Sequence, residues 1–125
     1  LSNSYYYARL MRSTKPEDVE VVSKIGFVFP NQDSWGTHVN ISGGAMAKQA
    51  KNPAEAVKFL EYLASDEAQA YFANGNNEWP AVATVKVANP ALEAMGSFKV
   101  DPLPIALAGA NQTQVQQMLD RVGYK

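Results

Sequence analysis

Apolar residues at helical spacing predict two consecutive helices in the middle of the chain. The first covers residues 53–64, where Asn52 precedes a proline at the first helical position. Its predicted buried stripe consists of Val57, Phe59, Leu60 and Leu63. Ser65 then caps a second helix, for which Asn74-Gly75 supplies the left-handed ending that many helices use.

Four further segments carry the signals of helix starts and stops: 2–12, 14–26, 90–95 and 111–123. The first opens at Ser2 or Asn3, either of which can cap a helix. The second opens with Thr14 in a capping box that has a proline near the first helical position. The last follows a cap at Asn111 and has an apolar stripe, which indicates that it packs onto a sheet.

Extended, β-prone segments lie between these predicted helices. They are residues 27–29, 37–41, 45–50 and 82–87. Because strands and helices alternate along the chain, the pattern predicts an α/β fold class, and 125 residues suffice for one compact domain.

Composition narrows the class of protein. Hydrophobic residues make up 46% and charged residues 18%, which is typical of a soluble globular protein with a packed core. The net charge of −1 and the lack of basic runs argue against nucleic acid as a partner. No segment has the length of a membrane span or the pattern of a signal peptide. The absence of cysteine excludes disulfides, thiolate metal sites and cysteine nucleophiles.

Three consecutive tyrosines, Tyr5, Tyr6 and Tyr7, at the start of the first predicted helix are the least expected feature. On the residues alone, the commoner interpretation is an aromatic cluster with one ring packed inward and the others half exposed. The functional interpretation is ligation of a hard cation by phenolate oxygens, for which ferric iron is the natural candidate. A trivalent cation favours the deprotonated phenol, and a helix start favours phenolates and a small co-bound anion.

Other candidate chemistries are weaker. His38 is the single histidine, and without cysteine it cannot assemble a zinc site by itself. A hydrolase that uses His38 with Ser42 and Asp33 is a further hypothesis, but no serine lies in a nucleophile-elbow motif. The sequence Ser42-Gly43-Gly44 is more typical of a turn or bulge than of a phosphate-binding loop.

The segment Asn3-Ser4-Tyr5-Tyr6 resembles the Asn-x-Tyr-Tyr signature of periplasmic ferric-iron-binding proteins. These are iron(III) ABC transporter substrate-binding proteins with the type II periplasmic binding protein fold. The resemblance covers essentially the whole chain, through further motifs at 29–33, 36–43, 51–56, 59–63, 67–69, 78–80 and 121–125. Many solute-binding proteins share the motifs of residues 36–80 in looser form, so the tyrosine pair is what selects iron.

This resemblance implies that the chain is the C-terminal portion of a two-lobed protein with mixed sheets flanked by helices. Residues 1–36 then belong to the C-terminal lobe, residues 37–86 to the N-terminal lobe, and residues 87–125 return to the C-terminal lobe. The chain is accordingly expected to be a fragment, whose exposed edges and apolar faces favour self-association.

The resemblance also implies a function. Tyr5 and Tyr6 match the paired tyrosinate ligands of Fe(3+), and Asn3 matches a position that contacts a synergistic anion, carbonate or phosphate, in some members. The remaining ligands, another tyrosine and in some branches a histidine or glutamate, precede Leu1. The expected protein captures ferric iron in the periplasm, delivers it to an inner-membrane ABC permease and is not an enzyme. The alternative is the same fold with another solute, an anion, a polyamine or a thiamine-like molecule, against which the tyrosines stack.

Overall fold

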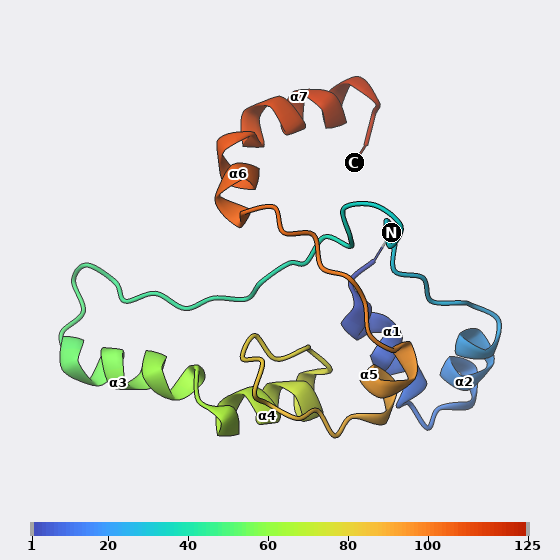
Figure 1. The fold of residues 1–125 in the computed structure, drawn as a ribbon, viewed down its shortest axis with the longest axis horizontal. Helices are drawn as coiled ribbons and strands as arrows, with labels where there is room; N and C mark the ends of the chain where they lie inside the picture. Colours follow the sequence, from blue (N-terminus) through green and yellow to red (C-terminus); the bar gives the residue numbers. More distant parts are fainter. Residues whose placement is uncertain (1, 125) are drawn as a thin grey trace. The chain divides into compact units, whose positions relative to one another are not determined.

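The computed structural model describes residues 2–124, which contain seven α-helices (Figure 1). The helices are α1 (Ser4–Met11), α2 (Pro16–Ser23), α3 (Pro53–Leu63), α4 (Asp66–Asn76), α5 (Pro90–Met95), α6 (Ile105–Ala110) and α7 (Gln112–Arg121). The chain forms two compact units. The first combines the chain up to Phe29 with Asn40–Phe98, and the second combines Pro30–Val39 with the chain from Lys99 onwards.

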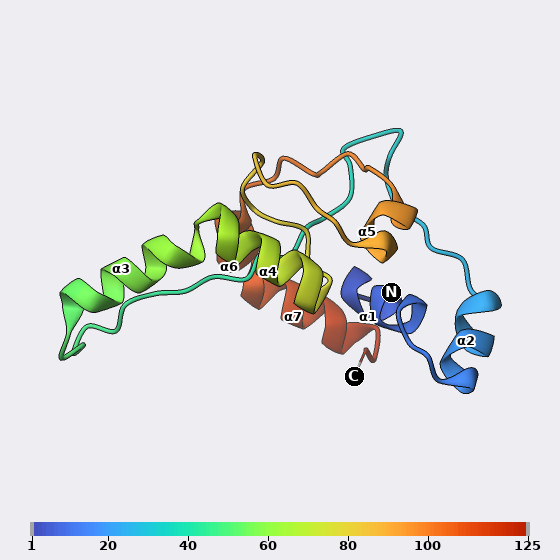
Figure 2. The ribbon, with the colours of Figure 1, turned by 90° about the horizontal axis from the view of Figure 1, so that it is seen from below.

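The core of the first unit is built from small side chains. Four residues of α1, α4 and α5 are buried together: Ala8, Ala73, Ala91 and Leu92. The partly buried Trp79, Val87 and Met95 pack against them. Because alanine side chains are short, the helix backbones approach closely, and α1 lies beside α2 and α5 in both views (Figures 1 and 2).

A buried polar network joins the ends of these helices. Asn89 is only 1% exposed, and its Nδ2 donates to the Ala73 carbonyl oxygen at 2.8 Å and to Asn77 Oδ1 at 2.9 Å. Its Oδ1 accepts from the backbone N–H groups of Ala91 and Leu92, at 3.0 and 3.4 Å, and so caps α5. Each polar atom of this buried amide is therefore satisfied, as buried polar groups must be to avoid a desolvation cost.

An aromatic cluster adjoins the core of the first unit through Trp79. The ring of Phe29 stacks on Phe98 with centroids 4.1 Å apart and meets Trp79 edge-on at 5.8 Å. Phe27 lies 4.8 Å from Phe29 in a T-shaped arrangement. These offset and edge-to-face geometries are the ones that aromatic rings prefer, so the cluster holds residues 27–29 against the second half of the unit.

In the second unit, Gln32 joins two segments that are distant in sequence. Its Oε1 accepts from the Lys99 N–H at 2.7 Å, and its Nε2 donates to the Lys99 carbonyl oxygen at 3.1 Å. The same Nε2 donates to the Thr37 hydroxyl at 2.8 Å. A single parallel bridge between Thr37 and Val100 completes the contact.

Most predicted helices are confirmed, including α3, α4, α5 and the Ser65 cap, which accepts from the Ala68 N–H at 3.3 Å. The predicted ending at Asn74-Gly75 was wrong, because α4 continues to Asn76 and the left-handed residue is Asn77, with φ 60° and ψ 39°. Hydrogen bonds from Arg12 and Asn89 to the Asn77 side chain fix this later ending.

One predicted helix cap was wrong, and one helix was not predicted. The cap of α2 is Lys15 rather than Thr14. No side chain caps the helix; the Ser13 hydroxyl, just before it, accepts from the Lys15 N–H at 3.3 Å and donates to Asp18 Oδ2 at 2.5 Å. Helix α6 was not predicted, because it follows Pro104 without the capping side chain that marked the equally short α5.

The predicted strands were wrong for this chain: residues 27–29, 37–41, 45–50 and 82–87 form no strand in the part that the structure describes. A strand needs a partner for its backbone N–H and C=O groups, and β-propensity cannot supply one. Residues 82–87 instead contain a turn closed by the Val85 N–H and the Val82 carbonyl oxygen. The mixed sheets expected from the resemblance are therefore not confirmed.

Two predicted apolar stripes are more exposed than expected. In α3, Val57 and Phe59 are 43% and 60% exposed, whereas Leu60 and Leu63 are half-buried. The stripe of α7 is exposed at Val115, at Met118 and at the C-cap residue Val122. The predicted packing of α7 onto a sheet was wrong within residues 2–124, because a helix stripe is buried only where an apolar surface faces it and these residues contain no sheet.

Candidate metal centre

The candidate centre lies at the start of α1. The N-cap residue of this helix, Asn3, is in an extended conformation and does not cap the helix through its side chain. Asn3 has φ −72° and ψ 142°, and its carbonyl oxygen accepts from the Tyr6 N–H at 3.3 Å. Its side-chain amide makes no capping hydrogen bond and is exposed. The helix therefore starts without a capping hydrogen bond from the Asn3 amide.

Tyr5 and Tyr6 approach each other although they are adjacent in a helix. Successive helical residues diverge by about 100° around the axis. The two rings nevertheless lie with centroids 4.2 Å apart and planes inclined by 38°. Tyr6 is 48% exposed and Tyr5 is half-buried. Side-chain rotation thus brings the two rings together at the accessible end of the helix.

The closeness of the pair changes the acidity of one member. Hydrogen bonding with Tyr5 is the largest cause that raises the pKa of Tyr6, and repulsion between the two phenolates and a small desolvation act in the same direction. The positive charge of Arg9, one turn along the helix, opposes this and lowers the pKa. Without a cation, the pair therefore favours a state in which Tyr6 keeps its proton.

Tyr7 points to a different environment. Its ring lies 5.2 Å from the ring of Phe27, at the edge of the aromatic cluster, and its hydroxyl donates to the Ile25 carbonyl oxygen at 3.5 Å. One ring of the three tyrosines therefore packs, as the structural interpretation predicted, while the other two form the pair.

The rest of α1 is held firmly behind the pair. Ala8 is fully buried in the core, and Arg12 follows it by one turn on the same face. The Nη1 atom of Arg12 donates to the Asn74 carbonyl oxygen at 2.6 Å and to Asn77 Oδ1 at 2.8 Å. Nothing in the sequence signals the long-range partners of Arg12, whereas Asn89 before Pro90 carries the signal of a helix cap.

Other candidate positions are less suited to a metal. Within residues 2–124, no three histidine, cysteine, aspartate or glutamate side chains gather into a group that could hold a metal ion. His38 is exposed, and no hydrogen bond joins it to Asp33 in the described residues. The tyrosine pair is thus the candidate that the chemistry of a hard cation favours.

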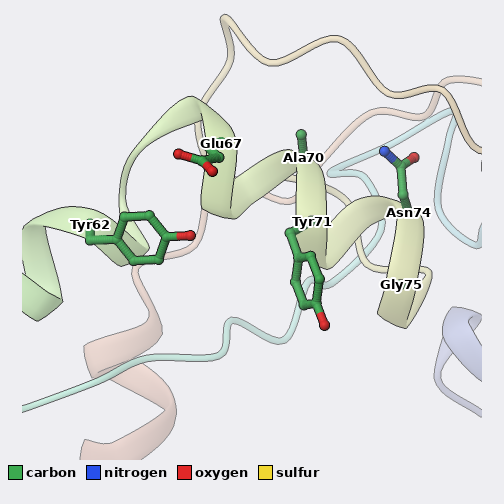
Figure 3. A pocket seen from close by; sticks show the side chains of 6 residues that line it. All are labelled: Tyr62, Glu67, Ala70, Tyr71, Asn74 and Gly75. Carbon is green, nitrogen blue, oxygen red and sulfur yellow. The ribbon is translucent and has the colours of Figure 1, made fainter.

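A hollow of about 510 Å³ lies elsewhere, between α3 and α4 (Figure 3). Its lining residues are Tyr62, Glu67, Ala70, Tyr71, Asn74 and Gly75. Tyr62 comes from α3 and Tyr71 from α4, and Tyr71 is 72% exposed. The hollow is open to solvent and includes neither Asn3 nor the tyrosine pair.

Comparison with known proteins connects this geometry to a family. Residues 3–99 match the family described as bacterial extracellular solute-binding protein. The chain belongs to this family. Iron uptake protein A2 of Synechocystis sp. is 48% identical to this solute-binding chain over 127 residues, which cover 100% of this chain and 36% of that protein.

Solved structures agree with this assignment. IdiA (FutA) of Trichodesmium in complex with iron and citrate is 52% identical, with a TM-score of 0.93 over 99% of this chain and 39% of that one. The ferric binding protein of Campylobacter jejuni is 39% identical, with a TM-score of 0.86 over 97% of this chain and 38% of that one. The solute-binding chain thus has the fold of the corresponding part of a type II periplasmic binding protein.

The solute-binding chain spans 36% of the length of the Synechocystis protein that it matches. The family description places its members outside the cytoplasm. Among the helices of residues 2–124, none has the length and apolarity needed to cross a membrane.

Proposed function

We propose that the chain is part of the substrate-binding protein of an ABC transporter, which captures ferric iron in the periplasm and delivers it to an inner-membrane permease. In this role it binds and releases its cargo without catalysing a reaction. The observation that carries the proposal is the pairing of the Tyr5 and Tyr6 rings, 4.2 Å apart, at the exposed start of α1. The 48% identity with an iron uptake protein supports it.

The chemistry of the pair suits ferric iron. Phenolate oxygen is a hard ligand, and a trivalent cation at bonding distance favours deprotonation of both phenols. Binding therefore releases protons, and the raised pKa of Tyr6 makes acid an effective competitor for the site. Release follows protonation, or reduction of the metal, which weakens the phenolate bonds.

A synergistic anion is the proposed second component. The first N–H groups of α1 have no partner inside the helix, and the dipole of the helix favours negative charge at this end. The uncommitted amide of Asn3 lies at the same end. We assign carbonate or phosphate to this position, where the anion would complete the charge balance of the iron.

The pair supplies two phenolate ligands, and an octahedral ferric ion needs more. We assign the remaining ligands to parts of the protein outside this chain, since the chain spans only 36% of its curated relative. Closure of the two lobes by a hinge motion then encloses the ion.

Spectroscopy of the full-length protein tests the proposal. Ferric iron should produce a visible tyrosinate-to-iron charge-transfer band, and metal analysis should find about one iron per molecule. The double variant Tyr5→Phe/Tyr6→Phe should lose the band. Tyr7→Phe is the matched control, because Tyr7 packs on Phe27 and should leave the band unchanged. A band that persists in the double variant would contradict the assignment, and binding of a polyamine or thiamine-like solute instead of iron would favour the alternative.

We further propose that the isolated 125-residue chain self-associates. Several large apolar side chains are more than half exposed, among them Val28 at 81%, Phe59 at 60% and Ile41 at 60%. Exposed apolar surface of this kind favours association. Sedimentation of the isolated chain should reveal dimers or larger species, and a clean monomer with cooperative unfolding would contradict this.

A further inference from the structure

We propose that Arg12 is a positioning residue for the tyrosine pair: it anchors the far end of α1 to the end of α4 and so holds Tyr5 and Tyr6 in the geometry that iron requires. This inference rests on the proposed function of the pair. It concerns a residue that carries no metal-ligand chemistry of its own, because a guanidinium has donors only.

The anchor is specific in its geometry. One nitrogen, Arg12 Nη1, donates both of its hydrogens, to the Asn74 carbonyl oxygen at 2.6 Å and to Asn77 Oδ1 at 2.8 Å. Both acceptors belong to the last turn and the C-cap of α4, where carbonyl groups lack helical partners and the dipole favours a positive charge. Charge-assisted hydrogen bonds of this kind are stronger than neutral ones.

The acceptor side is itself rigid. Asn77 is only 4% exposed and holds the left-handed conformation that ends α4. Its Oδ1 accepts a second hydrogen bond from the buried Asn89, which also caps α5 and donates to the Ala73 carbonyl oxygen. Arg12 therefore ties α1 to a network that already joins α4 and α5.

Loss of the anchor would let α1 tilt, and a tilt of the helix displaces the tyrosine pair. Arg12 follows Tyr5 by seven residues, which corresponds to about 10 Å along a helix. Ala8 lies about 4.5 Å along the helix from Tyr5, so a tilt of about 6° about Ala8 displaces the tyrosines by roughly 0.5 Å. Metal sites tolerate deviations of only about 0.2 Å in their bond lengths. Ala8 holds the middle of α1 in the core, and Arg12 limits tilting about that point at the far end of the helix, while the Tyr7–Phe27 contact does so near its start.

Arg12→Met tests the proposal in the full-length protein, because methionine retains much of the apolar stem and removes the donors. Its ferric-iron affinity, measured by competition with citrate while the protein is folded, should fall at least tenfold. Removal of a positive charge by itself would strengthen the binding of a trivalent cation, so a loss of affinity reports lost positioning. Arg12→Lys keeps a positive charge and a donor group, so it should recover part of the iron affinity.

Gln69→Met is the matched control. Gln69 also makes two hydrogen bonds, donating to the Leu63 carbonyl oxygen at 2.8 Å and accepting from the Ala81 N–H at 2.7 Å, but it does not contact α1. It should lower the melting temperature without changing iron affinity. Unchanged or tighter iron binding in Arg12→Met, or an equal loss in Gln69→Met, overturns the positioning role.

The failure of this inference can be told apart from failure of the proposed function. A wild-type protein without a tyrosinate band overturns both. A wild-type band that is lost in Tyr5→Phe/Tyr6→Phe, together with undiminished affinity in Arg12→Met, overturns the role of Arg12 alone.

Discussion

Asn89 Nδ2 donates to Asn77 Oδ1 at 2.9 Å, and these two asparagines are the buried polar side chains of the described residues, at 1% and 4% exposure. The bond joins the start of α5 to the end of α4 across 12 positions in the chain. Since Asn77 also accepts from Arg12, the same bond supports the helix that presents the tyrosine pair. Asn89, which caps α5 locally, therefore also helps to hold the helix that carries the candidate centre.

Asn89→Ala should therefore be costly. It removes the cap of α5 and leaves the buried Ala73 carbonyl oxygen without its side-chain donor. Together these losses should lower the free energy of unfolding by about 2–4 kcal/mol. Urea denaturation of the full-length protein measures the change. Asn52→Ala is the control, because Asn52 is an exposed helix cap that makes no side-chain cap bond, and it should cost less than about 0.5 kcal/mol.

Gly36→Ala should destabilise the second unit. Gly36 has φ +104°, and a Cβ there would lie 2.8 Å from the Lys99 carbonyl oxygen, which is backbone and cannot rotate away. The strain and the clash should cost at least about 2 kcal/mol by the same urea measurement. Gly26→Ala serves for comparison, because a Cβ at Gly26 meets nothing within 4 Å. Equal effects of the two substitutions would argue against the close approach at Gly36.

Ser65→Ala should cost about 1 kcal/mol, because the Ser65 hydroxyl accepts from the Ala68 N–H and caps α4. Asn52→Ala should cost only a few tenths of a kcal/mol, since Asn52 stands at the N-cap of α3 without a side-chain cap bond. Thermal unfolding of the two variants side by side measures the difference. The reverse order would show that Asn52 and not Ser65 acts as a cap in solution.

Tyr5→Phe should lower the pKa of Tyr6 toward its ordinary value, because the hydrogen bond and the charge of Tyr5 are the two largest causes that raise it. Arg9→Gln should raise the pKa of Tyr6 further, because the positive charge of Arg9 lowers it. Titration of the ring-carbon NMR signal of Tyr6 in the iron-free protein measures both shifts. Shifts in the same direction in both variants would contradict the proposed balance of charges.

The pKa of Tyr6 and the charge of Arg9 also determine how iron binding depends on pH. Iron binds the phenolate form, so protons compete with it, and a higher pKa strengthens the competition. Iron should therefore dissociate as the pH falls. Arg9→Gln raises the pKa of Tyr6, but it also removes a charge that repels the trivalent ion more strongly than it repels two protons, so the midpoint of release should shift to lower pH. A pH titration of the charge-transfer band in the full-length protein measures the midpoint. An unchanged midpoint would show that Arg9 does not influence the iron-bound pair.

The sequence by itself determined most of the helices and the donor chemistry of the candidate centre. Caps and prolines are local signals, so Asn52-Pro53, Ser65 and Pro90 located α3, α4 and α5 without any tertiary information. The adjacent tyrosines and Asn3 indicated ferric iron through the type of their donor atoms and through the resemblance to a family. Their role as ligands stays a prediction, although the family itself is confirmed.

Only the tertiary structure decided how these parts meet. It showed that Tyr5 and Tyr6 pair while Tyr7 packs on Phe27, that α4 ends at Asn77, and that the β-prone segments lack partners within residues 2–124. The physical reason is common to all three. The pairing of the rings depends on side-chain rotation. The left-handed ending of α4 and the pairing of strands depend on groups from elsewhere in the structure, and the local spacing of residues predicts none of these.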